Sequence, residues 1–148
     1  LLCLFASVPA ALVVRFFSGP TLKHLYSIAA GGTICWVAYG GLHASLNFWG
    51  LTLASYAIML ALPRKWSGYG VLLGSFTYLT YCNMSSPGTE AVDFTYTLRA
   101  LVLKMASCSM DYQDGALPHD KAQHRMYANR LQHLPSLLEF VSFVFFPG

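Results

Sequence analysis

The feature that most constrains this chain is a series of long apolar runs separated by short turn-forming sequences. A helix that crosses a bilayer needs about 20 predominantly apolar residues. Gly19-Pro20 and Pro63 end the first and third runs, because glycine and proline interrupt helices. Glycines within the second and fourth runs indicate close packing between helices. The runs predict four membrane-spanning helices, at about residues 1–17, 25–42, 44–62 and 66–84.

Composition supports a membrane protein. Apolar residues make up 55% of the chain and charged residues 10%, whereas soluble domains contain about 25% charged residues. The net charge of +3 is small and the basic residues are scattered, which argues against nucleic-acid binding. The predicted fold class is therefore an all-α, polytopic membrane helical bundle. We interpret the chain as the N-terminal part of one longer integral-membrane domain.

The basic residues of the predicted loops all fall on one side of the membrane. Arg15 and Lys23 flank the loop after the first run, and Arg64 and Lys65 lie after the third. The loops after the second and fourth runs contain neither lysine nor arginine. Loops rich in these residues face the cytosol. We therefore expect the basic loops to be cytosolic.

Residues 94–110 form a further predicted helix that is too polar to face lipid on all sides. Asp93 is a suitable N-cap, since its side chain can accept from the free amides of the first turn. The segment could pack inside a bundle, re-enter the membrane or lie at its surface. One apolar face recurs at helical spacing and consists of Phe94, Leu98, Leu101, Val102 and Met105.

A polar stretch, residues 111–139, follows this helix. Asp111 and Asp114 are spaced to share a helix face, which suits acid–base chemistry or a divalent ion. The preferred interpretation is structural: Asp114-Gly115 marks a helix end, and Asp111 pairs with a base such as Lys104. A second helix, capped by Asp120, is expected over residues 121–134, either on the membrane surface or over other helices.

A new element is predicted to begin at Pro135. Ser136 and Glu139 have the spacing of a capping box, in which the serine oxygen and the glutamate carboxylate each bind a backbone N–H of the first turn. The apolar run that follows, residues 137–146, is expected to re-enter the membrane.

Metal and catalytic signatures are missing from these residues. The four cysteines are spread out without metal or redox spacing. The sequence contains no H-E-x-x-H, no G-x-S-x-G and no phosphate-binding glycine loop. We expect no metal site, and the residues alone define no reaction.

Motifs in the second half nevertheless resemble a known family. The chain is similar to the membrane-bound O-acyltransferases, in particular their lysophospholipid acyltransferase branch, whose members carry an acidic-Phe start, a lysine-containing helix, a D-G turn, a charged stretch and then P-S-L-L-E. The matching segments are Asp93-Phe94-Thr95, Leu101-Val102-Leu103-Lys104, Ser107-Cys108-Ser109, Asp111-Tyr112-Gln113-Asp114-Gly115 and Leu134-Pro135-Ser136-Leu137-Leu138-Glu139-Phe140.

The resemblance implies a multi-pass enzyme of the endoplasmic reticulum that moves a fatty acyl group from acyl-CoA onto a lysophospholipid hydroxyl. Acyl-CoA would be a co-substrate, with no bound cofactor. In this family a histidine, assisted by an asparagine, acts in motifs downstream of P-S-L-L-E. None of the histidines here matches that motif, so we expect the catalytic residues beyond Gly148 and the 148-residue chain to be inactive alone.

Other residues inherit a role in shaping the reaction chamber or its cytosolic mouth. The basic residues among them could attract CoA phosphates or lipid headgroups, although anchoring to the cytosolic surface is the plainer interpretation. The candidates are Asp111, Asp114, Gly115, Pro135, Glu139, Lys121, Arg125 and Arg130.

Two alternatives remain open at this stage. The enzyme could belong to the same superfamily but act on a sterol, a diacylglycerol or a protein. The chain could also belong to a membrane transporter or structural protein, because glycine-rich helices with an interior Arg99 and Lys104 suit such proteins too. Against a transporter, the four predicted spans carry no ionisable residue deep in the membrane.

Overall fold

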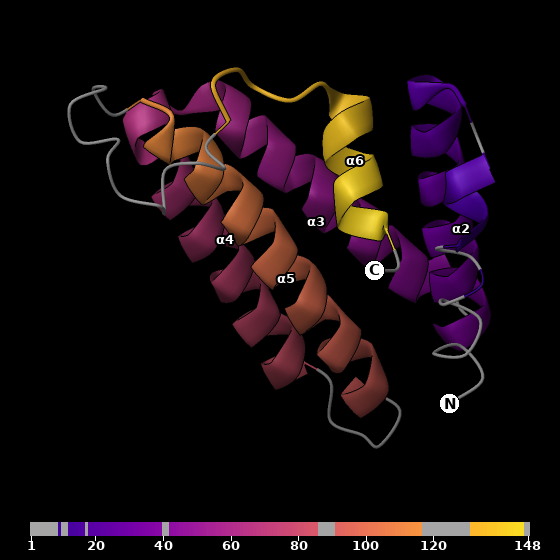
Figure 1. Ribbon diagram of the computed structural model, residues 1–148. Helices are drawn as coiled ribbons and strands as arrows, with labels where there is room; N and C mark the ends of the chain where they lie inside the picture. The colour runs from indigo at the N-terminus through magenta and orange to yellow at the C-terminus, as the bar shows by residue number, and fades with distance from the viewer. Residues whose placement is uncertain are drawn as a thin grey trace. The chain divides into compact units, whose positions relative to one another are not determined.

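The computed structural model describes residues 9, 12–16, 18–39, 42–85, 91–116 and 131–146. These residues contain helices and no strand, so the predicted all-α class is confirmed for them. The elements are the 3-10 helix η1 (Val14–Phe16) and the α-helices α2 (Pro20–Tyr39), α3 (Leu42–Ala61), α4 (Arg64–Ser85), α5 (Ala91–Asp114) and α6 (Leu137–Phe145) (Figure 1).

The chain forms two compact units. One unit comprises Leu1–Gly50 together with Ser136–Gly148, and it contains η1, α2, the beginning of α3 and α6. The other comprises Leu51–Pro135 and contains the rest of α3 with α4 and α5.

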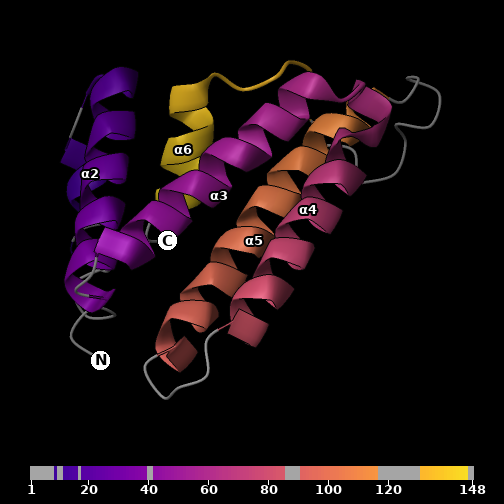
Figure 2. The ribbon, with the colours of Figure 1, turned by 180° about the vertical axis from the view of Figure 1, so that it is seen from behind.

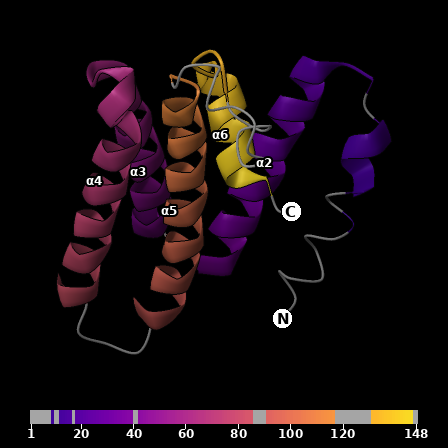
Figure 3. The same ribbon diagram turned by 60° about the vertical axis from the view of Figure 1, so that its left-hand side comes forward.

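Within the second unit, α4 and α5 pack side by side as an antiparallel pair (Figures 1, 2 and 3). The buried side chains of α5 follow the apolar face predicted from sequence, since Leu98, Leu101, Val102 and Met105 are all buried. The α4 face is lined by smaller residues. They are Ser67, Gly68, Val71 and Ser75, with Leu79 at its far end.

Small residues in α4 allow its neighbours to approach closely. A Cβ atom at Gly68 would lie 3.2 Å from Cα of Met110, and one at Gly74 would lie 3.2 Å from Cδ1 of Ile58. The buried Ser75 hydroxyl donates to the carbonyl oxygen of Val71 at 2.6 Å, which satisfies it without a partner on another helix. The prediction that the α4 glycines mediate tight packing is therefore confirmed.

In the first unit, α6 packs against α2 (Figures 1 and 2). A Cβ atom at Gly31 would overlap the carbonyl group of Phe145, so only glycine fits at this crossing. Nearby, Nδ1 of His24 lies 2.7 Å from Oγ of Ser142, and that hydroxyl also donates to the carbonyl oxygen of Glu139 at 2.8 Å. Because the hydroxyl proton is used in this second bond, His24 is the donor in the first.

The start of α6 is the capping box expected from sequence. The Glu139 amide donates to Oγ of Ser136 at 3.3 Å, and the Ser136 amide donates to Oε2 of Glu139 at 2.8 Å. This prediction is confirmed. With nine residues, α6 is too short to cross a bilayer.

Several predicted boundaries need correction. The helix α5 begins at Ala91, so Asp93 lies in its first turn and is not its N-cap. Residues 131–134 are not helical, so the helix expected over 121–134 does not reach Leu134. The helix α2 starts at Pro20, earlier than expected, because proline fits the first helical position. Most of residues 1–17 lies outside the described residues.

Among the described residues, one helix is long and apolar enough to cross a membrane, with the window Ala44–Ala61 in α3. This window matches the predicted third span. The helices α2 and α4 occupy most of the predicted second and fourth spans, but neither reaches the same mean hydropathy.

Candidate functional site

One arginine at the start of α4 binds the end of α5. The Arg64 guanidinium donates from Nε to the carbonyl oxygen of Tyr112 at 2.9 Å and from Nη2 to the carbonyl oxygen of Leu131 at 2.6 Å. Its Cζ atom lies 4.7 Å from the centre of the Tyr112 ring, within the range of a cation–π contact. We call this arrangement the Arg64 corner. It comprises Arg64, Gly68, residues 111–115 and Leu131.

The corner satisfies backbone groups that a helix end leaves open. The last four carbonyls of an α-helix have no partner within the helix, and they carry partial negative charge. Arg64 supplies one donor, to the Tyr112 carbonyl, and a positive charge at this end of α5. The carbonyl oxygen of Asp111 accepts from the amides of Gly115, at 3.2 Å, and Leu131, at 3.1 Å. These bonds hold the chain after the helix against its last turn.

Two further contacts complete the corner. The Gly68 amide donates to Oε1 of Gln113 at 3.0 Å, which joins α4 to α5 a second time. At Gly115, a Cβ atom would overlap the Leu131 carbonyl oxygen and Nη2 of Arg64. The D-G signal therefore marks a helix end, as predicted. Glycine is needed there for space, since Gly115 does not adopt the left-handed backbone conformation.

The two carboxylates of the corner interact with each other. Partial burial raises the pKa of Asp111, and the nearby charge of Asp114 raises it further. The predicted pairing of Asp111 with Lys104 is wrong: the structure shows no ion pair of Asp111 with any described residue. Lys104 lies two helical turns before Asp111. The last turn of α5, which carries Asp111, makes the contacts of the Arg64 corner instead.

Pro135 and Glu139 stand at the entry to α6. The carbonyl oxygen of Pro135 accepts from the Tyr56 hydroxyl at 3.0 Å, which anchors the chain before the helix to α3. The pKa of Glu139 is lowered, first by the hydrogen bond from the Ser136 amide and then by that from the Ser136 hydroxyl. Both predicted residues therefore have defined structural partners.

The remaining candidates, Lys121, Arg125 and Arg130, lie outside the described residues. The described residues contain no group of three or more histidine, cysteine or acidic side chains that could hold a metal ion. Cys108 is buried, while Cys35 and Cys82 are half-buried, and none of these three described cysteines forms a disulfide.

Sequence reasoning missed the central residue of the corner. Arg64 was interpreted as a loop charge that reports membrane orientation, whereas its side chain is the donor that fixes the D-Y-Q-D-G segment. The Arg64 hydrogen bonds are accepted by backbone carbonyl oxygens, which every residue carries. No residue pattern could therefore have identified the partners.

Three known proteins are similar in sequence to this chain. The chain is 32% identical to "Lysophospholipid acyltransferase 2" of Arabidopsis thaliana over 148 residues, which cover 97% of this chain and 31% of that protein. It is also 32% identical to "Lysophospholipid acyltransferase 1" of the same plant, with 97% and 32% covered. "Lysophospholipid acyltransferase 5" of Drosophila melanogaster is 26% identical, with 100% and 31% covered.

These matches agree with the resemblance indicated by the motifs. Along nearly its whole length the chain is similar to proteins named lysophospholipid acyltransferases, so the resemblance to this branch of the membrane-bound O-acyltransferases is confirmed. The chain spans about a third (31% and 32%) of the length of the plant relatives. No family model matches the chain. No solved structure matches it either.

Proposed function

We propose that this chain is part of a membrane-embedded enzyme that transfers a fatty acyl group from acyl-CoA to the free hydroxyl of a lysophospholipid. The observation that carries the proposal is the similarity to proteins named lysophospholipid acyltransferases along 97% of the chain. In such a reaction a general base removes the hydroxyl proton while the oxygen attacks the thioester carbon, and CoA leaves as the thiol.

Surface composition supports the membrane setting. Only 33% of the apolar window in α3 is buried, whereas the core helix of a soluble protein is mostly buried. Large apolar side chains are exposed on α3 and α4, and a soluble surface rarely carries so many together. They include Leu60 at 61%, Trp66 at 64%, Leu73 at 68% and Tyr81 at 66% exposure.

The role proposed for these 148 residues is structural. The Arg64 corner and the capping box hold the polar segments on either side of residues 117–130 through hydrogen bonds. No histidine in the sequence matches the histidine motif of the family. Asp111, Asp114, Gly115, Pro135 and Glu139 thus shape the enzyme, while Lys121, Arg125 and Arg130 attract CoA phosphates or anionic headgroups.

The test uses the full-length protein in microsomes with radiolabelled oleoyl-CoA and a panel of lysophospholipids. A version that ends at Gly148 is assayed beside it. We expect labelled phospholipid from the full chain and none from the shortened one. Product from the shortened chain would contradict the structural role. An inactive full chain with every lysophospholipid would contradict the proposed function, and sterol, diacylglycerol and protein acceptors would then be tested.

A further inference from the structure

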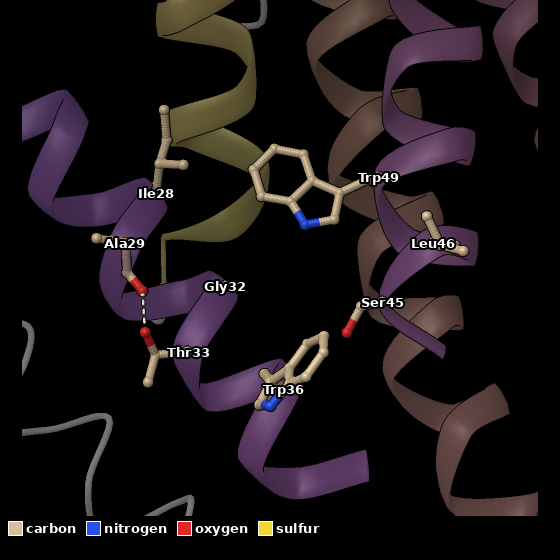
Figure 4. Close-up of a pocket in the computed structure, with 8 residues that line it drawn as sticks. All are labelled: Ile28, Ala29, Gly32, Thr33, Trp36, Ser45, Leu46 and Trp49. Atoms are coloured by element: carbon tan, nitrogen blue, oxygen red, sulfur yellow. Dashed lines mark hydrogen bonds between the residues drawn. The ribbon is translucent and has the colours of Figure 1, made fainter. Parts of the chain in front are cut away.

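An open pocket of about 460 Å³, called the cavity below, lies between the middle and C-terminal part of α2 and the beginning of α3, entirely within the first unit (Figure 4). Its volume falls in the range of about 300–1,000 Å³ that small-molecule sites occupy. The lining carries no ionised side chain. It consists of Ile28, Ala29, Gly32, Thr33 and Trp36 from α2, with Ser45, Leu46 and Trp49 from α3.

Small residues and a fixed aromatic wall create this space. Ala29, Gly32 and Thr33 place short side chains on one face of α2, so the helix leaves room beside it. The Trp49 ring forms the opposite wall and is stacked on the Phe145 ring of α6, with centroids 4.4 Å apart. At the C-terminal end of α2, the Tyr39 ring meets the Phe48 ring of α3 edge to face, with centroids 5.6 Å apart. The cavity therefore has walls held by packing.

Two hydrogen-bond donors remain available in this apolar space. The indole nitrogen of Trp49 and the hydroxyl of Ser45 both point into the cavity (Figure 4). Neither group hydrogen-bonds to any described residue. The Thr33 hydroxyl, by contrast, donates to the Ala29 carbonyl oxygen at 2.7 Å. The complementary ligand is thus an apolar chain with an uncharged acceptor, such as an ester carbonyl, because a phosphate would find no cation here.

We propose that this cavity binds the acyl chain of a lysophospholipid, with the ester carbonyl accepting from Trp49 and Ser45 and the headgroup outside. The identity of the lipid rests on the proposed function, whereas the apolar chain and the carbonyl follow from the cavity itself. A single acyl chain with one ester suits one apolar cavity with one polar end.

The first test maps binding on the unmodified full-length protein. A lysophosphatidylcholine with a photoreactive diazirine in its acyl chain is cross-linked in detergent, and labelled peptides are identified by mass spectrometry. We expect labels on residues 28–36 and 45–49. Labelling confined to other segments would overturn the proposal. Equal labelling of these residues by a two-chain phosphatidylcholine probe would also overturn it. So would cross-links within the protein that place another segment of the same polypeptide in the cavity.

The second test examines binding of the acyl chain by filling the apolar part of the cavity. Gly32→Leu fills the cavity, and Gly50→Leu is its matched control, because a Cβ atom at Gly50 meets no atom within 4 Å. We expect Gly32→Leu to lower labelling about tenfold, as for a loss of 1.4 kcal/mol in binding, and Gly50→Leu to leave it unchanged. Equal labelling of both variants would contradict the proposal.

The donors are tested by comparing ester and ether lysophosphatidylcholine, since the ether lacks the carbonyl. Loss of the two hydrogen bonds corresponds to roughly a 30-fold weaker affinity. We expect the unmodified protein to prefer the ester by this factor, and a Ser45→Ala/Trp49→Phe variant to bind both alike. If the enzyme is active but these binding effects are missing, lipid binding in the cavity is refuted and the proposed function stands. If the enzyme is inactive with every lysophospholipid, the proposed function is refuted.

Discussion

Nη2 of Arg64 donates to the carbonyl oxygen of Leu131 at 2.6 Å across 67 positions of the sequence. The same guanidinium binds the Tyr112 carbonyl oxygen, so one side chain holds the end of α5 and the chain that returns toward α6. A planar guanidinium can serve two acceptors at once with fixed geometry, whereas an ammonium group cannot reproduce that fork.

We predict that Arg64→Ala lowers the free energy of unfolding by about 2 kcal/mol, since hydrogen bonds from a charged group contribute about 1.5–3 kcal/mol. Arg64→Lys should recover only part of this loss. Thermal unfolding of the full-length protein in detergent measures the effect. Lys65→Ala is the matched control, because it removes the same charge from an exposed neighbour. Equal destabilisation by the two alanine variants would show that charge, and not the fork, matters.

Gly115→Ala should disrupt the same corner by a different route. The added methyl group would overlap the Leu131 carbonyl oxygen, so either the helix end or the returning chain must move. We expect destabilisation of about 1–3 kcal/mol, as for other overpacked sites. Gly50→Ala, which meets open space within α3, should be neutral or stabilising. Thermal unfolding of the two variants decides, and a stable Gly115→Ala protein would argue against the close approach.

The capping box predicts how α6 responds to acid. Because the folded pKa of Glu139 is lowered, its stabilising contribution is present above the unfolded pKa of about 4.3 and is lost as pH falls through the folded value. Glu139→Gln should remove this pH dependence. Ser136→Ala should cost about 1 kcal/mol at neutral pH. Protection factors from amide hydrogen exchange of residues 137–145, measured from pH 7 to pH 3.5, would report both effects. Protection factors in Glu139→Gln that still fall in acid would contradict the assignment.

The contribution of Asp111 to stability should depend on pH with the opposite sign to that of Glu139. Its pKa is raised, chiefly by partial burial, so the folded protein holds this proton more tightly than the unfolded one. Its contribution to stability falls as pH rises from the unfolded pKa of about 3.9 through the raised folded value. We expect Asp111→Asn to stabilise the protein slightly at neutral pH and to remove this slope. Thermal unfolding of both proteins across pH 4 to 7 measures this pH dependence. Destabilisation by Asp111→Asn would contradict the prediction and would reveal a favourable partner for the carboxylate.

Features that depend on nearby positions could be predicted from sequence. The capping box of Ser136 and Glu139 needs one oxygen and one carboxylate three positions apart, and the structure contains it. The apolar face of α5 repeats at helical spacing and is buried from Leu98 to Met105. The D-G turn at Gly115 also ends its helix as expected. The error at Asp93 has the same origin, because capping residues are common inside the first turn as well.

The site itself depended on long-range contacts. The helical class, the capping box, the glycine packing faces and the resemblance to lysophospholipid acyltransferases follow from the sequence alone, because they depend on short-range spacing and on the order of motifs. Only the tertiary structure decided that Arg64 binds Leu131, that Gly31 meets Phe145, and that Trp49 faces a cavity beside Gly32. Every residue type carries the same backbone carbonyl, and a cavity leaves no pattern in the sequence. These contacts are therefore fixed only when distant helices pack together.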